Sequence, residues 1–498
     1  MTERRRRKSY WSAFRGADGA LFGALLVLLL WAPIPLGSAR PWAVSLLAVM
    51  ALLIASVWLL LLVLGKCRSN SLELTHWVIA AAGIAWLLWT GFHWLPMDGE
   101  TLKNLSPLLH SYYAAANEYL ARPATFRLSL DAGSSYRQWL LTAGLLAYGV
   151  TVWGCVNTRQ RQRILMWSIV LLGFTQALVG ACLELSNMEP QWFGSVINGP
   201  LGASGTYVNR NHFAGCLEIS LAVGIGLLVS RLSTNTATNW RQRLRAFIDL
   251  LMSEKIRLRL ILIAMVVGLI LSRSRMGNVA FFSALIGCGL FYILVRERRL
   301  FLKSVLLFGS ILLIDLMVVG QWYGVDKVVD RLEKTDAGSE MRVVIFPDLN
   351  RIAQDSNQVG IGLGAFYAIF PDYRTDLVWQ RFHHAHNDYL QFYIETGLPG
   401  IVLLALMIGG VVLYAIRLII NRRDRLACGI GLACFMAFTA IGIHSLVDFN
   451  LQIPANAFLL CAVAALALGC SQVSRSEQLA ARREREKQQQ VSAEPEST

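Results

Sequence analysis

Long apolar runs, separated by shorter charged or polar segments, dominate the sequence. Runs of about 18 or more residues without a charge are transmembrane helix candidates, because a helix of about 20 residues crosses the hydrocarbon core of a bilayer. The pattern predicts an all-α polytopic membrane protein with about 12 transmembrane helices. The expected spans lie at about residues 19–36, 41–65, 75–95, 138–155, 163–182, 212–230, 257–272, 276–295, 303–321, 398–416, 426–446 and 454–471.

Basic residues predict the orientation of these spans. An even number of spans places both termini on one side of the membrane, and most of the 46 lysines and arginines lie in the terminal segments and loops of that side. Cytoplasmic loops carry such an excess. We therefore expect cytoplasmic termini and three long segments on the outer side, at about 96–137, 183–211 and 322–397.

The longest outer segment, 322–397, lies between the ninth and tenth spans, and connections of that length usually carry function. The first outer segment contains an amphipathic run from Leu102 to Tyr112, which we expect on the membrane surface. The resulting divisions are a basic N-terminus at 1–18, a multispan domain at 19–471 that includes the 322–397 loop, and a polar tail at 472–498 that we expect to be disordered.

Composition agrees with a membrane protein, since 55% of the 498 residues are hydrophobic and only 16% are charged. The net charge of +14 would also suit a nucleic-acid binder, but the basic residues cluster between apolar runs, so topology explains it better. We predict no nucleic-acid partner.

The nine cysteines lie almost entirely inside or at the ends of the runs, which does not favour a disulfide framework. The basic stretch Arg4 to Lys8 imitates a signal peptide, and we interpret the first apolar run as an uncleaved helix.

One polar stretch within the longest outer segment, Q-R-F-H-H-A-H-N-D-Y-L-Q, combines three histidines with the start of a helix. Asp388 and Gln391 fit a capping box, and Gly397 followed by a proline is typical of a helix end. His386 then lies just outside a helix N-terminus, where the partial positive charge disfavours imidazolium. A neutral ring is what a general base requires, so His386 is the candidate base.

Two other interpretations of the histidine stretch remain open. The histidines can form a stacked structural cap. A metal site is the second alternative, because His383, His384, His386 and Asp388 are all ligand types. No matching cluster of carboxylates or cysteines accompanies them, so we predict neither a metal nor another cofactor.

Three further polar stretches are expected on the same side: Gly205–His212, Ser272–Arg275 and His444–Pro454. Their arginines stand where basic residues are sparse, and a charge at the centre of a helix costs roughly 2.5–3.5 kcal/mol on insertion. Guanidinium matches phosphate oxygens, so the arginines could hold a diphosphate leaving group without a metal. The alternative is that they extend to lipid headgroups. The candidates are Arg210, Arg273 and Arg275, and the i, i+2 spacing of the last two lets one of them face the site.

The last polar stretch places His444 and Asp448 four residues apart, on one face of a helix. The carboxylate could orient the imidazole or a sugar hydroxyl, and a polar cap at the membrane boundary is the alternative. The stretch Gly360–Gly364 is similar to a phosphate loop, but no Lys-Ser/Thr follows it, so we interpret it as a turn.

Together these stretches resemble the O-antigen ligase/O-antigen polymerase superfamily of bacterial membrane glycosyltransferases. The resemblance covers about residues 200–460 and depends on the order of its pieces. The pieces are V-N-R-N-H-F-A-G (208–215), S-R-S-R-M-G (272–277), M-R-V-V-I-F-P-D-L (341–349), G-I-G-L-G-A-F (360–366), H-A-H-N-D-Y-L-Q (384–391), E-T-G-L-P-G (395–400) and S-L-V-D-F-N-L-Q-I-P (445–454).

The resemblance implies a GT-C-like fold and an undecaprenyl-diphosphate-linked glycan as donor. It also implies a bacterial inner-membrane protein that acts at the periplasmic face without metal or nucleotide. The family's outer-face arginines correspond to Arg210 and to Arg273 or Arg275, its loop histidine to His386 and its late aspartate to Asp448. The complete set of expected site residues is His386 as the catalytic base, with Asn209, Arg210, His212, Arg273, Arg275, Asn387, His444 and Asp448 as substrate-binding residues.

The predicted function is metal-independent transfer of the glycan to an acceptor hydroxyl. The acceptor is lipid A core in a ligase, another lipid-linked glycan in a polymerase, or a protein hydroxyl in the related O-oligosaccharyltransferases. The first two are favoured because no protein-binding module is attached. A transporter or flippase for a polyprenyl-linked glycan is the alternative from another class, and a non-catalytic scaffold is a third. Transporters bind near the bilayer midplane between repeats, whereas these polar stretches gather at one surface.

Overall fold

The computed structural model describes most of the chain. The described residues are 13–67, 72–121, 123–186, 188–197, 202–231, 254–296, 309, 344–356, 358–376, 378 and 382–470. The expected span at 303–321 apart from residue 309, most of the first 18 residues and the tail from 472 lie outside them.

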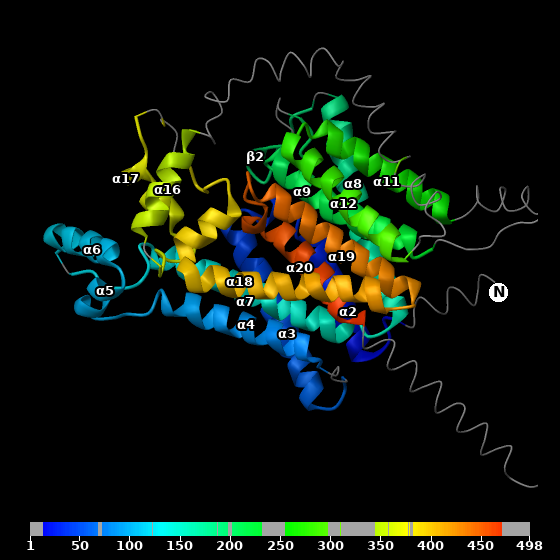
Figure 1. Cartoon of the computed structure of the whole chain (residues 1–498), viewed down its shortest axis with the longest axis horizontal. Helices are drawn as coiled ribbons and strands as arrows, with labels where there is room; N and C mark the ends of the chain where they lie inside the picture. The colour runs from blue at the N-terminus through cyan, green and yellow to red at the C-terminus, as the bar shows by residue number, and fades with distance from the viewer. Residues whose placement is uncertain are drawn as a thin grey trace, which may run out of the picture.

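Helices form almost all of the secondary structure of this part (Figure 1). The one strand pair, β1 (Gln191–Trp192) with β2 (Ser195–Val196), is a short antiparallel hairpin. The α-helices are α2 (Gly16–Trp31), α3 (Pro41–Val63), α4 (Leu74–Phe92), α5 (Gly99–Leu105), α6 (Pro107–Tyr119), α7 (Ala132–Cys155), α8 (Arg159–Leu185), α9 (Arg210–Val229), α11 (Glu254–Leu271), α12 (Arg275–Arg296), α16 (Phe346–Asp355), α17 (Phe366–Tyr373), α18 (Asp388–Asn421), α19 (Arg425–His444) and α20 (Pro454–Leu468).

Among the described residues, 7 helices are long and apolar enough to cross a membrane: α3, α4, α8, α9, α12, α18 and α19. The apolar helices α2 and α20 are shorter. A helix occurs at each expected span except 303–321, of which only residue 309 is described. The prediction of an all-α membrane protein is thus confirmed, while the number of twelve spans and the complete outer loop stay predictions.

Helix α9 is the centre of the bundle. Each of its residues from Asn211 to Val229 is buried, so it has no lipid-facing side. It packs against α8, α11 and α19. Close approach is possible because an ideal Cβ on Gly226 would lie 2.2 Å from the carbonyl oxygen of Gly429 on α19, which leaves room only for glycine. A buried central helix gives the residues at its N-terminus a rigid base.

Four shorter helices, α5, α6, α16 and α17, form a separate group that we call the end module. It lies at one end of the molecule (Figure 1). Leu102 and Leu109 have no exposed surface and pack in one apolar cluster with Leu349 and Phe366. The expectation that the amphipathic run from Leu102 lies on the membrane surface is therefore wrong, because its apolar face is covered by the rest of this module.

The end module is joined to α18 where that helix is interrupted. Gly397 has φ 66° and ψ −170°, a conformation open essentially to glycine alone, and it breaks the helix in two. The backbone N–H groups of Ile361 and Gly362 donate to the carbonyl oxygens of Ile394 (3.0 Å) and Glu395 (2.9 Å). The stretch 360–364 is thus a turn that fixes the module beside the first part of α18, as interpreted from the sequence.

Candidate active site

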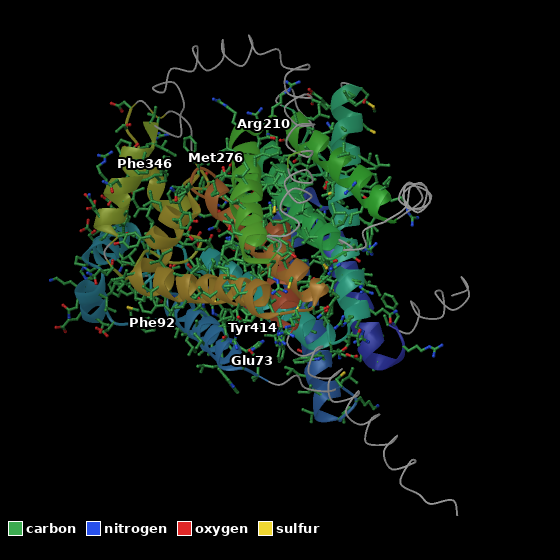
Figure 2. The ribbon with its side chains drawn as sticks, turned by 45° about the vertical axis from the view of Figure 1, so that its right-hand side comes forward. Glu73, Phe92, Arg210, Met276, Phe346 and Tyr414 are labelled. Atoms are coloured by element: carbon green, nitrogen blue, oxygen red, sulfur yellow. The ribbon has the colours of Figure 1, made fainter. Side chains whose placement is uncertain are left out.

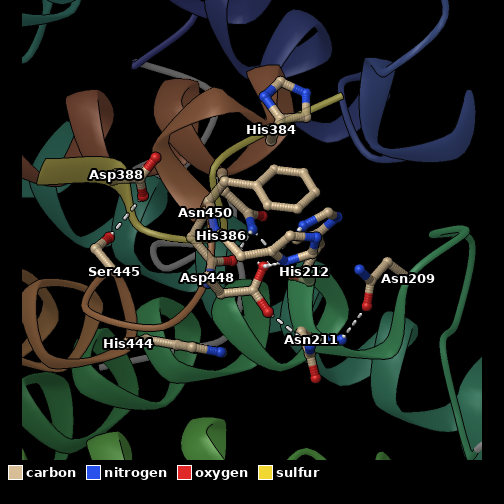
Figure 3. A network of polar contacts seen from close by, with 12 residues as sticks. Asn209, Asn211, His212, His384, His386, Asp388, His444, Ser445, Asp448 and Asn450 are labelled. Carbon is tan, nitrogen blue, oxygen red and sulfur yellow. Dashed lines mark hydrogen bonds and ion pairs between the residues drawn. The ribbon is translucent and has the colours of Figure 1, made fainter. Parts of the chain in front are cut away.

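Three segments far apart in the sequence meet at one end of α9 (Figure 3). They are the first turn of α9, the turn 445–451 that follows α19, and the histidine loop, which we define as residues 382–387. Asn209 caps α9 by accepting a hydrogen bond from the N–H of Asn211 at 2.8 Å. Helix α9 thereby begins at Arg210, and the two residues that follow it point toward the other segments.

Asp448 is the point where the three segments touch. Its carboxylate has no exposed surface and accepts hydrogen bonds from Nδ2 of Asn211 at 2.6 Å and from the N–H of Phe449 at 2.9 Å. Oδ1 lies 3.6 Å from Nε2 of His212 and 3.8 Å from Nδ1 of His386. These are ion-pair distances, so the carboxylate would stabilise a positive charge that appears on either ring.

The ring of Phe449 organises three imidazoles. His384 stacks on it with a centroid distance of 4.3 Å, while His212 and His386 meet it edge to face at 4.5 and 4.8 Å. Edge-to-face and stacked contacts restrict ring orientation as well as position. Phe449 therefore fixes how the histidines present their nitrogen atoms.

His384 is held neutral. Burial lowers the pKa of His384 to about 3, and the neighbouring His212 adds to this effect. A ring with so low a pKa carries no proton charge at ordinary pH. His384 consequently contributes shape and a fixed hydrogen bond, without adding positive charge beside His386.

The backbone at His386 is strained. Its φ is 51°, in the left-handed region that costs a non-glycine residue about 1–3 kcal/mol. Immediately after it, the side chain of Asn387 caps α18 by accepting from the N–H of Leu390 at 3.0 Å and donates from Nδ2 to the carbonyl of Leu446 at 2.9 Å. The cap is thus Asn387 and not Asp388, which corrects the predicted capping box.

Asp388 instead fastens α18 to the turn 445–451. One of its oxygens accepts from Oγ of Ser445 at 2.7 Å and from the N–H of Leu451 at 3.0 Å. The N–H of Asp388 donates to the carbonyl of Ser445 at 3.0 Å. The segment that carries His386 is in this way bonded directly to the segment that carries Asp448.

The expectation that His444 and Asp448 share one helical face is wrong. Helix α19 ends at His444, so Asp448 follows in a turn and does not share a helical face with it. His444 contacts Glu218 on α9 instead, with Nδ1 at 2.7 Å from Oε1, and neither side chain has exposed surface. This pair lies inside the bundle, without exposed surface.

Two of the three candidate arginines begin helices. Arg210 is the first residue of α9 and Arg275 the first of α12, and the two helices pack together (Figure 2). An ideal Cβ on Gly277 would lie 2.7 Å from Cβ of Ala214, so the contact lies within about a turn of both helix starts. Arg273 has a different partner: its Nη2 lies 2.7 Å from Oε1 of Glu184 on α8.

The four residues considered as metal ligands make other contacts. His383 stacks on Tyr367 with the centroids 4.2 Å apart, and Asp388 binds Ser445. His384 and His386 both contact Phe449, and His386 also faces Asp448. Among the described residues no group of three or more His, Cys, Asp and Glu side chains is arranged to hold a metal ion.

Several contact residues escaped the sequence reasoning. Phe449 and Asn211 were passed over inside stretches that were otherwise noticed, because an apolar ring and an amide carry no distinctive spacing. Glu218 had a usable signal, since it is the one acidic residue in the apolar run of α9, and ionisable residues inside a span usually have a role. Gln391 was noticed only as part of a capping box, and Glu395 carried no distinctive spacing.

The fold and the site define a polytopic membrane protein with a polar, histidine-rich centre at one end of its helix bundle. Residues 260–405 match a family model described as O-antigen ligase. The match includes Arg273, Arg275, the histidine loop and the first part of α18, and it confirms the resemblance to the O-antigen ligase superfamily. It indicates a membrane enzyme of the glycosyltransferase or ligase type. No curated protein matches the chain.

Proposed function

We propose that the protein transfers a glycan from an undecaprenyl-diphosphate carrier to an acceptor hydroxyl at the periplasmic face of the bacterial inner membrane. The observation that carries the proposal is the contact of His386 with the buried carboxylate of Asp448. The same carboxylate accepts from Asn211, the residue that directly follows Arg210 at the start of α9. The O-antigen ligase match supports the reaction class.

His386 is the general base in this proposal. Its Nδ1 faces Asp448, which favours a proton on that nitrogen and leaves Nε2 to accept one. The acceptor hydroxyl gives its proton to Nε2 while its oxygen forms a bond to the anomeric carbon of the donor sugar. The bond from that carbon to the diphosphate oxygen breaks, and the diphosphate leaves with the electron pair. Attack opposite the leaving group inverts the anomeric centre.

Arg210 and Arg275 hold the diphosphate. Each begins a helix, where the positive end of the helix dipole adds to the guanidinium charge. Arg273 already pairs with Glu184, so a phosphate must displace that carboxylate to use it. No metal takes part in this proposal.

The acceptor is a sugar hydroxyl of lipid A core or of a second lipid-linked glycan. A protein hydroxyl is the alternative, and products made from defined acceptors would separate them. Both termini are cytoplasmic in this arrangement, because the basic loops then lie inside.

Purified protein with a labelled polyprenyl-diphosphate glycan and candidate acceptors tests the proposal. His386→Ala should lower transfer by at least about 100-fold, the usual contribution of a general base, and should retain donor binding. His383→Ala is the matched control, because His383 is exposed in the same loop and stacks on Tyr367. Transfer by His386→Ala at the wild-type rate would exclude the base assignment, and no transfer by the wild-type protein with any acceptor would exclude the proposed function.

A further inference from the structure

Glu395 is a buried carboxylate that the reaction does not use. It lies near the end of the first part of α18 and has no exposed surface. Oε2 accepts from the N–H of Gly364 at 2.8 Å, and Oε1 accepts from Nε2 of Gln391 at 3.0 Å and more distantly from the N–H of Phe366 at 3.4 Å. A carboxylate is costly to bury, so three donors directed at it indicate a specific role.

Gln391 carries this arrangement to the histidine loop. Its Oε1 accepts from the N–H of Ala385 at 3.0 Å, and its Nε2 lies 3.1 Å from Nδ1 of His384. The two amide hydrogens are thus shared between Glu395 and His384, and the reversed amide would set two N–H groups against each other at Ala385. His384 consequently accepts at Nδ1 and carries its proton on Nε2.

The bond to Ala385 lies directly before the strained residue. Left-handed backbone at a non-glycine residue persists only where neighbouring contacts determine it. His386 is held on its far side by Asn387, and on its near side by Ala385 through Gln391. Glu395 keeps the Gln391 amide in the orientation that makes this possible.

We propose that Glu395 and Gln391 are positioning residues, which set the histidine loop so that His386 faces the acceptor hydroxyl. Because Glu395 also binds the turn at Gly364, placement of the end module and placement of the base depend on one carboxylate. This inference rests on the proposed glycan transfer.

The test compares Glu395→Gln with Glu118→Gln, the same change at an exposed position of α6 in the end module. Glu395→Gln puts an NH₂ group against a donor N–H. A displacement of about 1 Å at a reacting group can cost roughly 100-fold, so kcat should fall by about that factor while donor KM stays within about twofold. Glu118→Gln should match the wild-type protein.

A second variant separates positioning from a loss of folding. The exchange Gln391→Glu with Glu395→Gln restores one donor facing one acceptor between these two positions, and Ala385 can still donate to the new carboxylate. His384 must then carry its proton on Nδ1, so that this nitrogen donates to the new carboxylate instead of accepting from an amide. We expect its kcat to exceed that of either single variant by at least about tenfold.

Unchanged kcat in Glu395→Gln, or an exchange variant that folds yet remains as slow as the single variants, would overturn the inference. If the wild-type protein of the same preparation transfers glycan, either result leaves the proposed function unaffected. Absence of transfer by the wild-type protein would instead count against the proposed function.

Discussion

The Asp448→Asn substitution tests the electrostatic part of the site with almost no change of shape. The carboxylate has no exposed surface, and its Oδ1 lies 3.8 Å from Nδ1 of His386. An amide keeps the volume and can accept from Nδ2 of Asn211, but its NH₂ group then replaces Oδ1 as the partner of the N–H of Phe449. The amide also lacks the negative charge that would stabilise His386 once that ring has taken a proton.

The distance between the two charged groups sets the size of the expected loss in rate. Unit charges 3.8 Å apart attract by about 4 kcal/mol at an effective dielectric of 20, which corresponds to roughly 1000-fold in rate. The side chain of His386 is 18% exposed, and water screens part of this attraction. We therefore expect Asp448→Asn to lower kcat by about 30- to 1000-fold, with little change in donor KM because the arginines hold the diphosphate.

The assay is single-turnover transfer of a labelled glycan by protein in lipid nanodiscs, with acceptor in excess. Donor binding is measured separately without acceptor. Glu118→Gln again provides the matched control, since it removes an exposed carboxylate outside the site. A single-turnover rate within about twofold of wild type would refute the reasoning, because a charge this close cannot be neutral to a step that protonates His386.

Three further outcomes follow from individual residues. Burial lowers the pKa of His384 to about 3 from 6.5, so between these pH values the unfolded chain binds a proton that the folded chain does not. The contribution of His384 to stability is therefore complete above pH 6.5 and falls toward pH 3 by at most about 1.4 kcal/mol per pH unit. His384→Phe should flatten the plot of melting temperature against pH in this range, and an unchanged slope of that plot would contradict the reasoning. Gly397→Ala should destabilise the protein by at least about 3 kcal/mol, because its Cβ would lie 2.0 Å from the carbonyl oxygen of Gln358, whereas Gly409→Ala on the same helix meets nothing within 4 Å and should melt like the wild type. Arg210→Lys should weaken donor binding about tenfold through loss of the bidentate fork, and wild-type affinity would exclude that role.

Much of the helical framework could be predicted from the sequence, because membrane helices are recognisable as long apolar runs. The predicted starts at 41, 276, 426 and 454 lie within one residue of the observed starts of α3, α12, α19 and α20. The end module could not be predicted, because its helices are short and its apolar faces find each other only through contacts between Leu102 and Leu349, far apart in the chain.

The site was predicted as a set of stretches but not as a set of pairs. The sequence placed His386 and Asp448 on one side of the membrane, and the structure brings them to 3.8 Å. Spacing alone placed His444 and Asp448 on one helical face, and that prediction failed because α19 ends at His444. Local periodicity holds only while the helix continues, so partners across a helix end depend on tertiary packing.

The distribution of buried carboxylates gives an independent reason to place function at this end of the bundle. Among the described residues, the acidic side chains with at most 1% exposure are Glu218, Asp348, Asp388, Glu395 and Asp448. Removing an acidic group from water costs several kcal/mol unless bonded partners compensate, and an apolar side chain would serve packing alone at lower cost. Asp388 directly follows the histidine loop, Asp448 lies 3.8 Å from His386, and Glu395 is bonded to the loop through Gln391. Glu218 binds His444 beside the turn 445–451, while Asp348 pairs with Arg351 in the end module. Retaining so many costly groups around one strained histidine is intelligible if their geometry is needed for chemistry, and it is hard to explain for a scaffold.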